Sequence, residues 1–322
     1  MKDNIPCFRI KPGFGQAFEA HLKASYELWT ATLGTDGISR LQPVAALPET
    51  TPGALPVISF KKLLAPPKES LWTWDGIQFT PAEPQPRRAV FGVARCDLQA
   101  LWYLDQVFAD DALYQKNRQQ LLVIGAPCQA TDGCRCQPSA FPLSGDLFLA
   151  DDHVWSLSSS GNILLTQLTE WLGVTVNRPL PEAWPATTES GDVSEALFKS
   201  SLGAPLWQQA SQPCLACGAC SVVCPTCYCY DMIDHNDLTG TCTRQRVWDN
   251  CFFSSHAKVA GGHDFRPDRA ARLRFRFEHK KLGFGTLRGR PSCVGCGRCL
   301  EACPVGIDLD QVARQLQMGH AL

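Results

Sequence analysis

Two cysteine-rich runs with the same spacing lie in the second half of this chain. They are Cys214-x-x-Cys217-x-x-Cys220-x-x-x-Cys224-Pro225 and Cys293-x-x-Cys296-x-x-Cys299-x-x-x-Cys303-Pro304. In bacterial two-cluster proteins with this pattern, three thiolates of one run and the fourth of the other hold each cubane. The spacing therefore predicts two [4Fe–4S] clusters. We expect the first on Cys214, Cys217, Cys220 and Cys303, and the second on Cys293, Cys296, Cys299 and Cys224.

Zinc is the alternative interpretation of these cysteines. Structural zinc sites need four ligands and usually take them from separated Cys pairs. Here eight cysteines form two equal runs, and a proline ends each run in a turn that frees the fourth thiolate. This pattern favours iron–sulfur clusters over zinc.

Composition predicts a globular cytoplasmic protein. Of the 322 residues, 45% are hydrophobic and 19% are charged, which is enough for a core and argues against disorder. Clustered cysteines in so long a chain fit metal thiolates in a reducing compartment. The N-terminus lacks the apolar stretch of a signal peptide, and residues 121–127 are far shorter than the roughly 18 apolar residues that span a membrane. We expect no direct membrane insertion, and the net charge of −1 does not indicate nucleic-acid binding.

The N-terminal part, residues 1–177, predicts an α/β domain. Residues 14–33 show the apolar spacing of an amphipathic helix. Farther on, a strand over 88–93, a helix over 97–108 and a strand over 121–125 form a βαβ unit, so the two strands should be parallel.

The C-terminal part, residues 194–322, predicts an α-helical ferredoxin-like domain that carries the two clusters. Residues 178–193 are rich in Pro, Ser, Thr and Ala and predict a linker. The insert between Cys224 and Cys293 is much longer than in a compact bacterial ferredoxin, and both flanks of the runs show helical patterns. We therefore expect helices rather than a β-hairpin frame around the runs.

Four further cysteines form a candidate third metal site in the N-terminal domain. Cys96 and Cys128 follow the two predicted parallel strands, whose carboxyl ends meet at one edge of a sheet. Cys134 and Cys136 come shortly afterwards in a polar loop. Four thiols are the number that a [4Fe–4S] cluster needs, but Cys96 and Cys128 could equally be buried core cysteines. Spacing alone leaves both interpretations open.

Several segments resemble the beta subunits of soluble NiFe hydrogenases (sulfhydrogenases) and the iron–sulfur electron-transfer subunit of anaerobic sulfite reductase. The resemblance covers most of residues 55–310 and is densest in the second half. It begins with 59–71 and 91–100, and its most specific segments are Cys224-Pro-Thr-Cys-Tyr-Cys229, Val247-Trp-Asp-Asn-Cys251, Ala260-Gly-Gly-His-Asp264 and Cys293-Val-Gly-Cys-Gly-Arg-Cys299.

This resemblance implies an electron-transfer subunit. It would link a flavin- or NAD(P)H-dependent reductase subunit to a catalytic redox subunit. The resemblance also implies a third [4Fe–4S] cluster on Cys96, Cys128, Cys134 and Cys136. Arg95 stands where family members often have proline, which affects the expected turn before Cys96 but not the thiol.

Other candidate residues have alternative interpretations. Cys227 and Cys229 could be an extra ligand and a redox thiol, although packing beside a cluster is the simpler interpretation. Cys7, Cys242 and Cys251 show no partner spacing, and the histidines are expected to be structural. The basic segment 269–292 could bind nucleic acid or dock an acidic redox partner, but a solvated helix face or cations near the clusters explain it more simply.

No residue pattern predicts a substrate site, because no Ser/His/Asp triad or carboxylate pair stands out. We therefore expect no catalytic residues and an electron-transfer component that is not catalytic alone, with cofactors supplying the chemistry. Two alternatives remain at this stage. The chain could reduce a sulfur compound at the edge of a cluster, or it could be a non-catalytic module that clusters hold together.

Overall fold

The computed structural model describes residues 5–48, 54–129, 131–136, 142–181 and 193–319, and its architecture is mixed α/β. Most of the predicted linker, 178–193, lies outside the described residues. Among the described helices, none is both long and apolar enough to cross a membrane.

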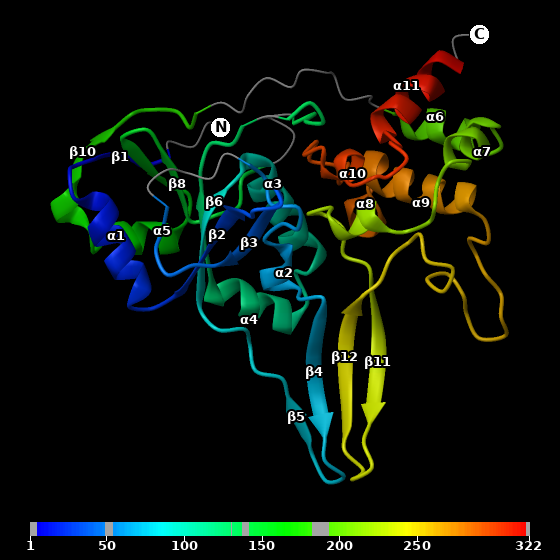
Figure 1. The fold of residues 1–322 in the computed structure, drawn as a ribbon, viewed down its shortest axis with the longest axis horizontal. Helices are drawn as coiled ribbons and strands as arrows, with labels where there is room; N and C mark the ends of the chain where they lie inside the picture. The colour runs from blue at the N-terminus through cyan, green and yellow to red at the C-terminus, as the bar shows by residue number, and fades with distance from the viewer. Residues whose placement is uncertain (1–4, 49–53, 130, 137–141, 182–192, 320–322) are drawn as a thin grey trace.

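An eight-stranded sheet organises the N-terminal part, in the order β10-β1-β9-β8-β7-β6-β2-β3 (Figure 1). Its central strands β2, β6, β7 and β8 are parallel neighbours, and the outer pairs are antiparallel. The strand bounds are β1 Cys7–Ile10, β2 Glu27–Leu33, β3 Ser39–Pro43, β6 Arg88–Val93, β7 Leu121–Gly125, β8 Leu147–Ala150, β9 His153–Ser156 and β10 Leu172–Val176.

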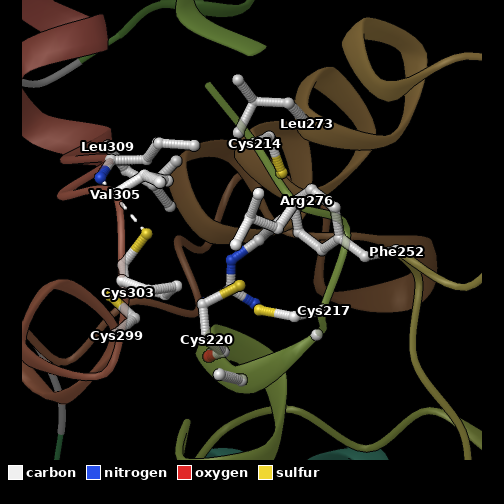
Figure 2. Close-up of a pocket in the computed structure, with 15 residues that line it drawn as sticks. Cys214, Cys217, Cys220, Phe252, Leu273, Arg276, Cys299, Cys303, Val305 and Leu309 are labelled. Carbon is white, nitrogen blue, oxygen red and sulfur yellow. Dashed lines mark hydrogen bonds between the residues drawn. The ribbon is translucent and has the colours of Figure 1, made fainter. Parts of the chain in front are cut away.

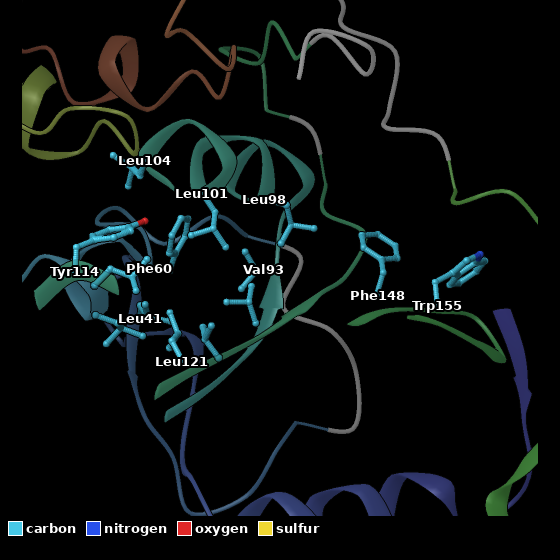
Figure 3. Packing of buried hydrophobic residues seen from close by; sticks show 14 of the residues in the cluster. Leu41, Phe60, Val93, Leu98, Leu101, Leu104, Tyr114, Leu121, Phe148 and Trp155 are labelled. Atoms are coloured by element: carbon cyan, nitrogen blue, oxygen red, sulfur yellow. The ribbon is translucent and has the colours of Figure 1, made fainter. Parts of the chain in front are cut away.

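Helices cover both faces of this sheet because its central strands are apolar on both sides. Leu98, Leu101 and Leu104 of α3 (Arg95–Val107) pack on one face, together with α2 (Lys61–Leu64) and α4 (Ala112–Gln120) (Figure 3). On the other face lie α1 (Phe14–Lys23) and α5 (Ser159–Thr166), followed by the short 3₁₀ helix η1 (Thr169–Trp171). The chain passes from β6 through α3 and α4 to its parallel neighbour β7.

The helix predicted over 14–33 is wrong in its second half. α1 ends at Lys23, and residues 27–33 form β2, which pairs with β3 and β6. Leu28 and Thr30 face the interior at the two-residue spacing of a strand. Because Leu22 and Leu28 are both buried, the apolar spacing looked continuous although the backbone changes from helix to strand between them.

Short helices dominate the region after residue 193. They are α6 Glu195–Ser200, α7 Leu206–Ser211, α8 Ala219–Val222, α9 Arg269–Leu282, the 3₁₀ helix η2 Gly285–Leu287, α10 Arg298–Glu301 and α11 Leu309–Gly319. Trp207, Phe277 and Leu316 from α7, α9 and α11 meet in one apolar core. This core supports the two cysteine runs from one side.

A β-hairpin that the sequence did not predict interrupts the helical region. β11 (Tyr230–Asn236) and β12 (Cys242–Trp248) pair with β4 (Lys68–Trp74) and β5 (Phe79–Pro81) in a second sheet, which extends as an arm in Figure 1. Asp237 ends the hairpin by accepting bonds from the amides of Thr239 and Thr241. The sheet thus joins the insert between the cysteine runs to residues 68–81.

Candidate metal centres

The two cysteine runs repeat one backbone conformation. In each run a short helix, α8 or α10, starts after a glycine in the left-handed region, Gly218 with φ 76° or Gly297 with φ 75°. The position two residues after the first cysteine is also left-handed in both runs, with φ 53° at Ala216 and φ 67° at Gly295. A left-handed alanine is uncommon, and such strain persists where the surrounding structure over-determines the backbone. The repeated motif is therefore also a repeated structure.

The first three-cysteine segment faces the end of the second run. Figure 2 shows a cavity with Cys214, Cys217 and Cys220 on one side and Cys299 and Cys303 on the other. Backbone amides donate to two of these sulfurs, from Ala216 to Cys214 at 3.4 Å and from Ile307 to Cys303 at 3.3 Å. Cys303 thus lies across the cavity from Cys214, Cys217 and Cys220, as the crossed assignment requires.

Cys224 lies correspondingly close to the second run. Burial raises the pKa of Cys299 to about 12; Arg276 opposes this rise, and Cys293, Cys224 and Cys220 add to it. Charge on Cys224 also acts on Cys293 and Cys296. The electrostatic neighbours of the second run therefore include the last cysteine of the first.

The four N-terminal cysteines meet at the carboxyl ends of β6 and β7. Burial raises the pKa of Cys128 to about 12, and charges on Cys96 and Cys134 add to it. Cys136 shares hydrogen bonds with Cys134 and Cys96. The Cys134 pKa falls to about 5, chiefly because of its bond with Cys136. The structure therefore brings together all four thiols.

This N-terminal group packs directly against the second cysteine run. Cys96 and Cys296 share one buried cluster, with Cys128 and Cys136 beside it. The Arg135 amide donates to the Gly295 carbonyl at 2.6 Å. Next to this contact, Arg298 makes a two-pronged ion pair with Asp97 at 2.8 and 2.7 Å, and both side chains are buried. Such a pair fixes orientation as well as distance.

Buried cations surround the two runs. Lys280 donates to Thr226 and Ser292, Lys61 donates to the carbonyls of Val222 and Cys224, and Arg276 donates to the Cys220 carbonyl. None of the salt bridges in the described part of the chain includes these three side chains. The solvated helix face expected for 269–292 is therefore wrong for Arg272, Arg276, Lys280 and Lys281, which are buried. Close to the clusters is where the alternative interpretation placed such cations.

These donor sets fit iron–sulfur clusters. A buried cation is stable only with a counter-charge, and a thiolate-bound cluster is anionic. No group of three or more His, Cys, Asp or Glu side chains within the described ranges is arranged to hold a single metal ion. The ligands of a cubane bind separate iron atoms, so they need not converge on one point.

The remaining cysteines differ in their surroundings. Cys227 accepts a bond from Arg276 at 3.3 Å and lies against Cys224, whereas Cys7 is buried in the N-terminal core. Cys251, for which the sequence showed no partner, hydrogen-bonds with Cys229 and lies 3.7 Å from the Ser221 hydroxyl. The pairing of β11 with β12 creates this contact, which spacing could not reveal. His279 stacks on Phe284, consistent with a structural role.

Comparisons with known proteins agree with this geometry. Residues 213–307 match the family described as 4Fe-4S dicluster domain. Over 279 residues the chain is 29% identical to Sulfhydrogenase 2 subunit beta of Pyrococcus furiosus, a match that covers 80% of this chain and 83% of that protein. The chain is a homologue of the hydrogenase beta subunits. The resemblance predicted from the motifs is therefore confirmed for this hydrogenase family, and a role for [4Fe–4S] clusters in this homologue is supported. No solved structure matches the chain.

Close backbone packing between Gly297 and Gly133 generates a prediction about this hydrogenase homologue. A Cβ atom on Gly297 would lie 2.6 Å from the Gly133 carbonyl group, and φ is 75°. Gly306 is also left-handed, with φ 66°, but has open space around it. We expect Gly306→Ala to lower the free energy of unfolding by about 1–2 kcal/mol through strain alone. Gly297→Ala should lower it further, because two backbones must separate.

Urea unfolding of both variants, followed by intrinsic fluorescence, measures this difference. Equal losses for the two variants would contradict the tight packing of the second cysteine run against the N-terminal loop.

Proposed function

We propose that this chain is the electron-transfer subunit of a multisubunit oxidoreductase. The observation that carries the proposal is the placement of twelve cysteines in three neighbouring groups, each with the four thiols that one cubane needs. When bound, [4Fe–4S] clusters supply one-electron transfer. The described residues show no other constellation that would serve a substrate, so the proposal assigns no catalytic residue.

The proposed ligand sets follow the groups seen in the structure. Cys303 completes the first set because it faces the cavity of the first run. Cys224 completes the second because its charge acts on all three cysteines there. The sets are Cys214, Cys217, Cys220 and Cys303; Cys293, Cys296, Cys299 and Cys224; and Cys96, Cys128, Cys134 and Cys136.

The chain's own residues orient these thiols and exclude water from them. Backbone amides of Ala216 and Ile307 donate to sulfur, which is one of the factors that set cluster potentials. The Arg298–Asp97 pair holds the N-terminal group against the second run. In this arrangement the second group lies between the other two, and the three form a continuous series rather than separate centres.

The series suggests where partners bind. One end contains Cys217, which is exposed, and the other contains Cys128 and Cys136, which are half-buried. We propose that one end accepts electrons from a flavin- or NAD(P)H-linked partner, while the other passes them to a catalytic subunit, or the reverse. The name of the Pyrococcus relative, a sulfhydrogenase subunit, supports a hydrogenase-like assembly in a cytoplasmic setting.

The electron-transfer proposal predicts reversible reduction without turnover. The isolated chain, purified anaerobically, should be reduced by dithionite and reoxidised through several cycles, as followed by electron paramagnetic resonance. It should show no hydrogen, sulfite or NAD(P)H turnover, because it lacks a substrate site. Robust turnover by the chain alone would favour the enzyme alternative, and clusters that do not cycle would favour purely structural ones.

The third ligand set predicts the iron content. Fully reconstituted protein should contain about twelve irons per chain, the number for three [4Fe–4S] clusters. Cys134→Ala with Cys136→Ala should lower this by about four and leave the C-terminal signals intact. Cys242→Ala is the matched control, because Cys242 lies on the β12 strand of the arm. An iron count near eight that the double substitution does not change would remove the third cluster.

The crossed assignment predicts which cluster a single substitution damages. Cys303→Ala should weaken the cluster of Cys214, Cys217 and Cys220, because Cys303 faces their cavity. Cys224→Ala should instead weaken the cluster of the second run. Electron paramagnetic resonance of the two variants separates the signals. If each substitution damaged the cluster of its own run, the crossed ligand sets would be wrong.

A further inference from the structure

Arg276 occupies a place that ligand binding to iron does not explain. It is 3% exposed and enters the cavity of the first group from α9, beside Cys217 and Cys220 in Figure 2. Its guanidinium donates to the Ser221 hydroxyl at 3.0 Å, the Cys220 carbonyl at 2.9 Å and the Cys227 sulfur at 3.3 Å. All of these partners belong to the first run or directly follow it.

Arg276 also reaches the second group. Cys299 lines the same cavity, and Cys299 and Cys224 are among the charges that act on Arg276. Lys280, one helical turn farther along α9, is 4% exposed and bonds to Thr226 beside Cys224 and to Ser292 beside Cys293. One face of α9 thus places two cations between the first two groups. The third group does not contact either cation through any hydrogen bond of the described residues.

These cations oppose folding when no anion accompanies them. Moving a charged group out of water is costly unless it is paired, and breaking a buried pair leaves that cost uncompensated. The salt bridges of the described residues give neither Arg276 nor Lys280 a carboxylate. Hydroxyls and carbonyls satisfy their hydrogen bonds but do not neutralise their charge. A fold that retains such cations must receive negative charge from another source.

We propose that Arg276, supported by Lys280, is a counter-charge shared by the two C-terminal cluster sites, which makes the stable fold of this region depend on loading of the clusters. The inference rests on the proposed function and extends it. Because reduction adds negative charge, a nearby cation favours the reduced state and raises the reduction potential. One cation between two sites raises both potentials together.

The matched pair of variants is Arg276→Gln and Arg274→Gln. Both arginines lie on α9, but Arg274 is partly exposed and donates to the Leu202 carbonyl, away from the cysteines. Redox titration of the loaded proteins, followed by electron paramagnetic resonance, should show both C-terminal potentials shifted to more negative values in Arg276→Gln. The N-terminal signal should stay in place, and Arg274→Gln should shift no signal. Loaded Arg276→Gln protein with unshifted C-terminal potentials would overturn the inference.

A second measurement needs no cluster. Iron-free protein at about pH 6 holds most of its thiols protonated, since the ordinary cysteine pKa is about 8.5. Under these conditions Arg276→Gln and Lys280→Met should melt at higher temperature than wild-type apoprotein, whereas both should retain clusters less well than wild type. A lower melting temperature for both apoproteins would overturn the counter-charge role. This comparison remains decisive if a variant fails to load iron.

The two proposals fail in different ways. Wild-type protein without a reversible iron–sulfur signal would contradict the proposed electron transfer, and the apoprotein comparison would then decide the counter-charge on its own. Reversible wild-type signals with potentials that Arg276→Gln leaves unchanged would preserve the electron-transfer role and remove only the counter-charge.

Discussion

Charge compensation around buried thiols is the constraint on which the C-terminal half depends. Arg276, Lys280 and Lys61 enter a region rich in cysteine, and no carboxylate accompanies them in the salt bridges of the described residues. Each of these cations would be destabilising in an apolar core. Beside thiolate-bound clusters, the same cations and the anionic groups stabilise each other. The helical frame, the cysteine runs and the cations therefore form one electrostatic unit, and no part of it is fully explained without the others.

Backbone conformation imposes the second constraint. The two runs share left-handed residues at equivalent positions, and these turns direct the fourth cysteine of each run toward the other run. Different elements cover the two turns: the Asn250 amide donates to the Gly218 carbonyl at 2.7 Å, whereas the backbone of Gly133 covers Gly297. The internal repeat is thus symmetric in its local geometry and asymmetric in its environment. That asymmetry places the N-terminal cysteines beside the second run only.

Two contacts join the N-terminal sheet to the cysteine runs, and each has a mechanical consequence. The Arg298–Asp97 pair is almost completely buried, so removal of one partner would leave an uncompensated charge. The β4–β12 pairing extends one sheet across both parts of the chain, and the buried Arg246–Glu69 pair fastens its base. Together these contacts hold the three cysteine groups in a fixed relation. Transfer between neighbouring centres requires such a fixed relation, because an electron-transfer path depends on constant separation.

The sequence by itself determined the chemistry of the two cysteine runs, because ligand type and spacing are local and repeat almost without change. It also determined the strands 88–93 and 121–125, whose apolar composition suits a sheet buried on both faces. Tertiary structure alone decided that residues 27–33 form a strand, since pairing with β6 overrides an apolar spacing that also fits a helix. It likewise decided the contact between Cys229 and Cys251 and the burial of Arg276. Those features depend on which distant segments pack together, and no periodicity along the chain encodes that packing.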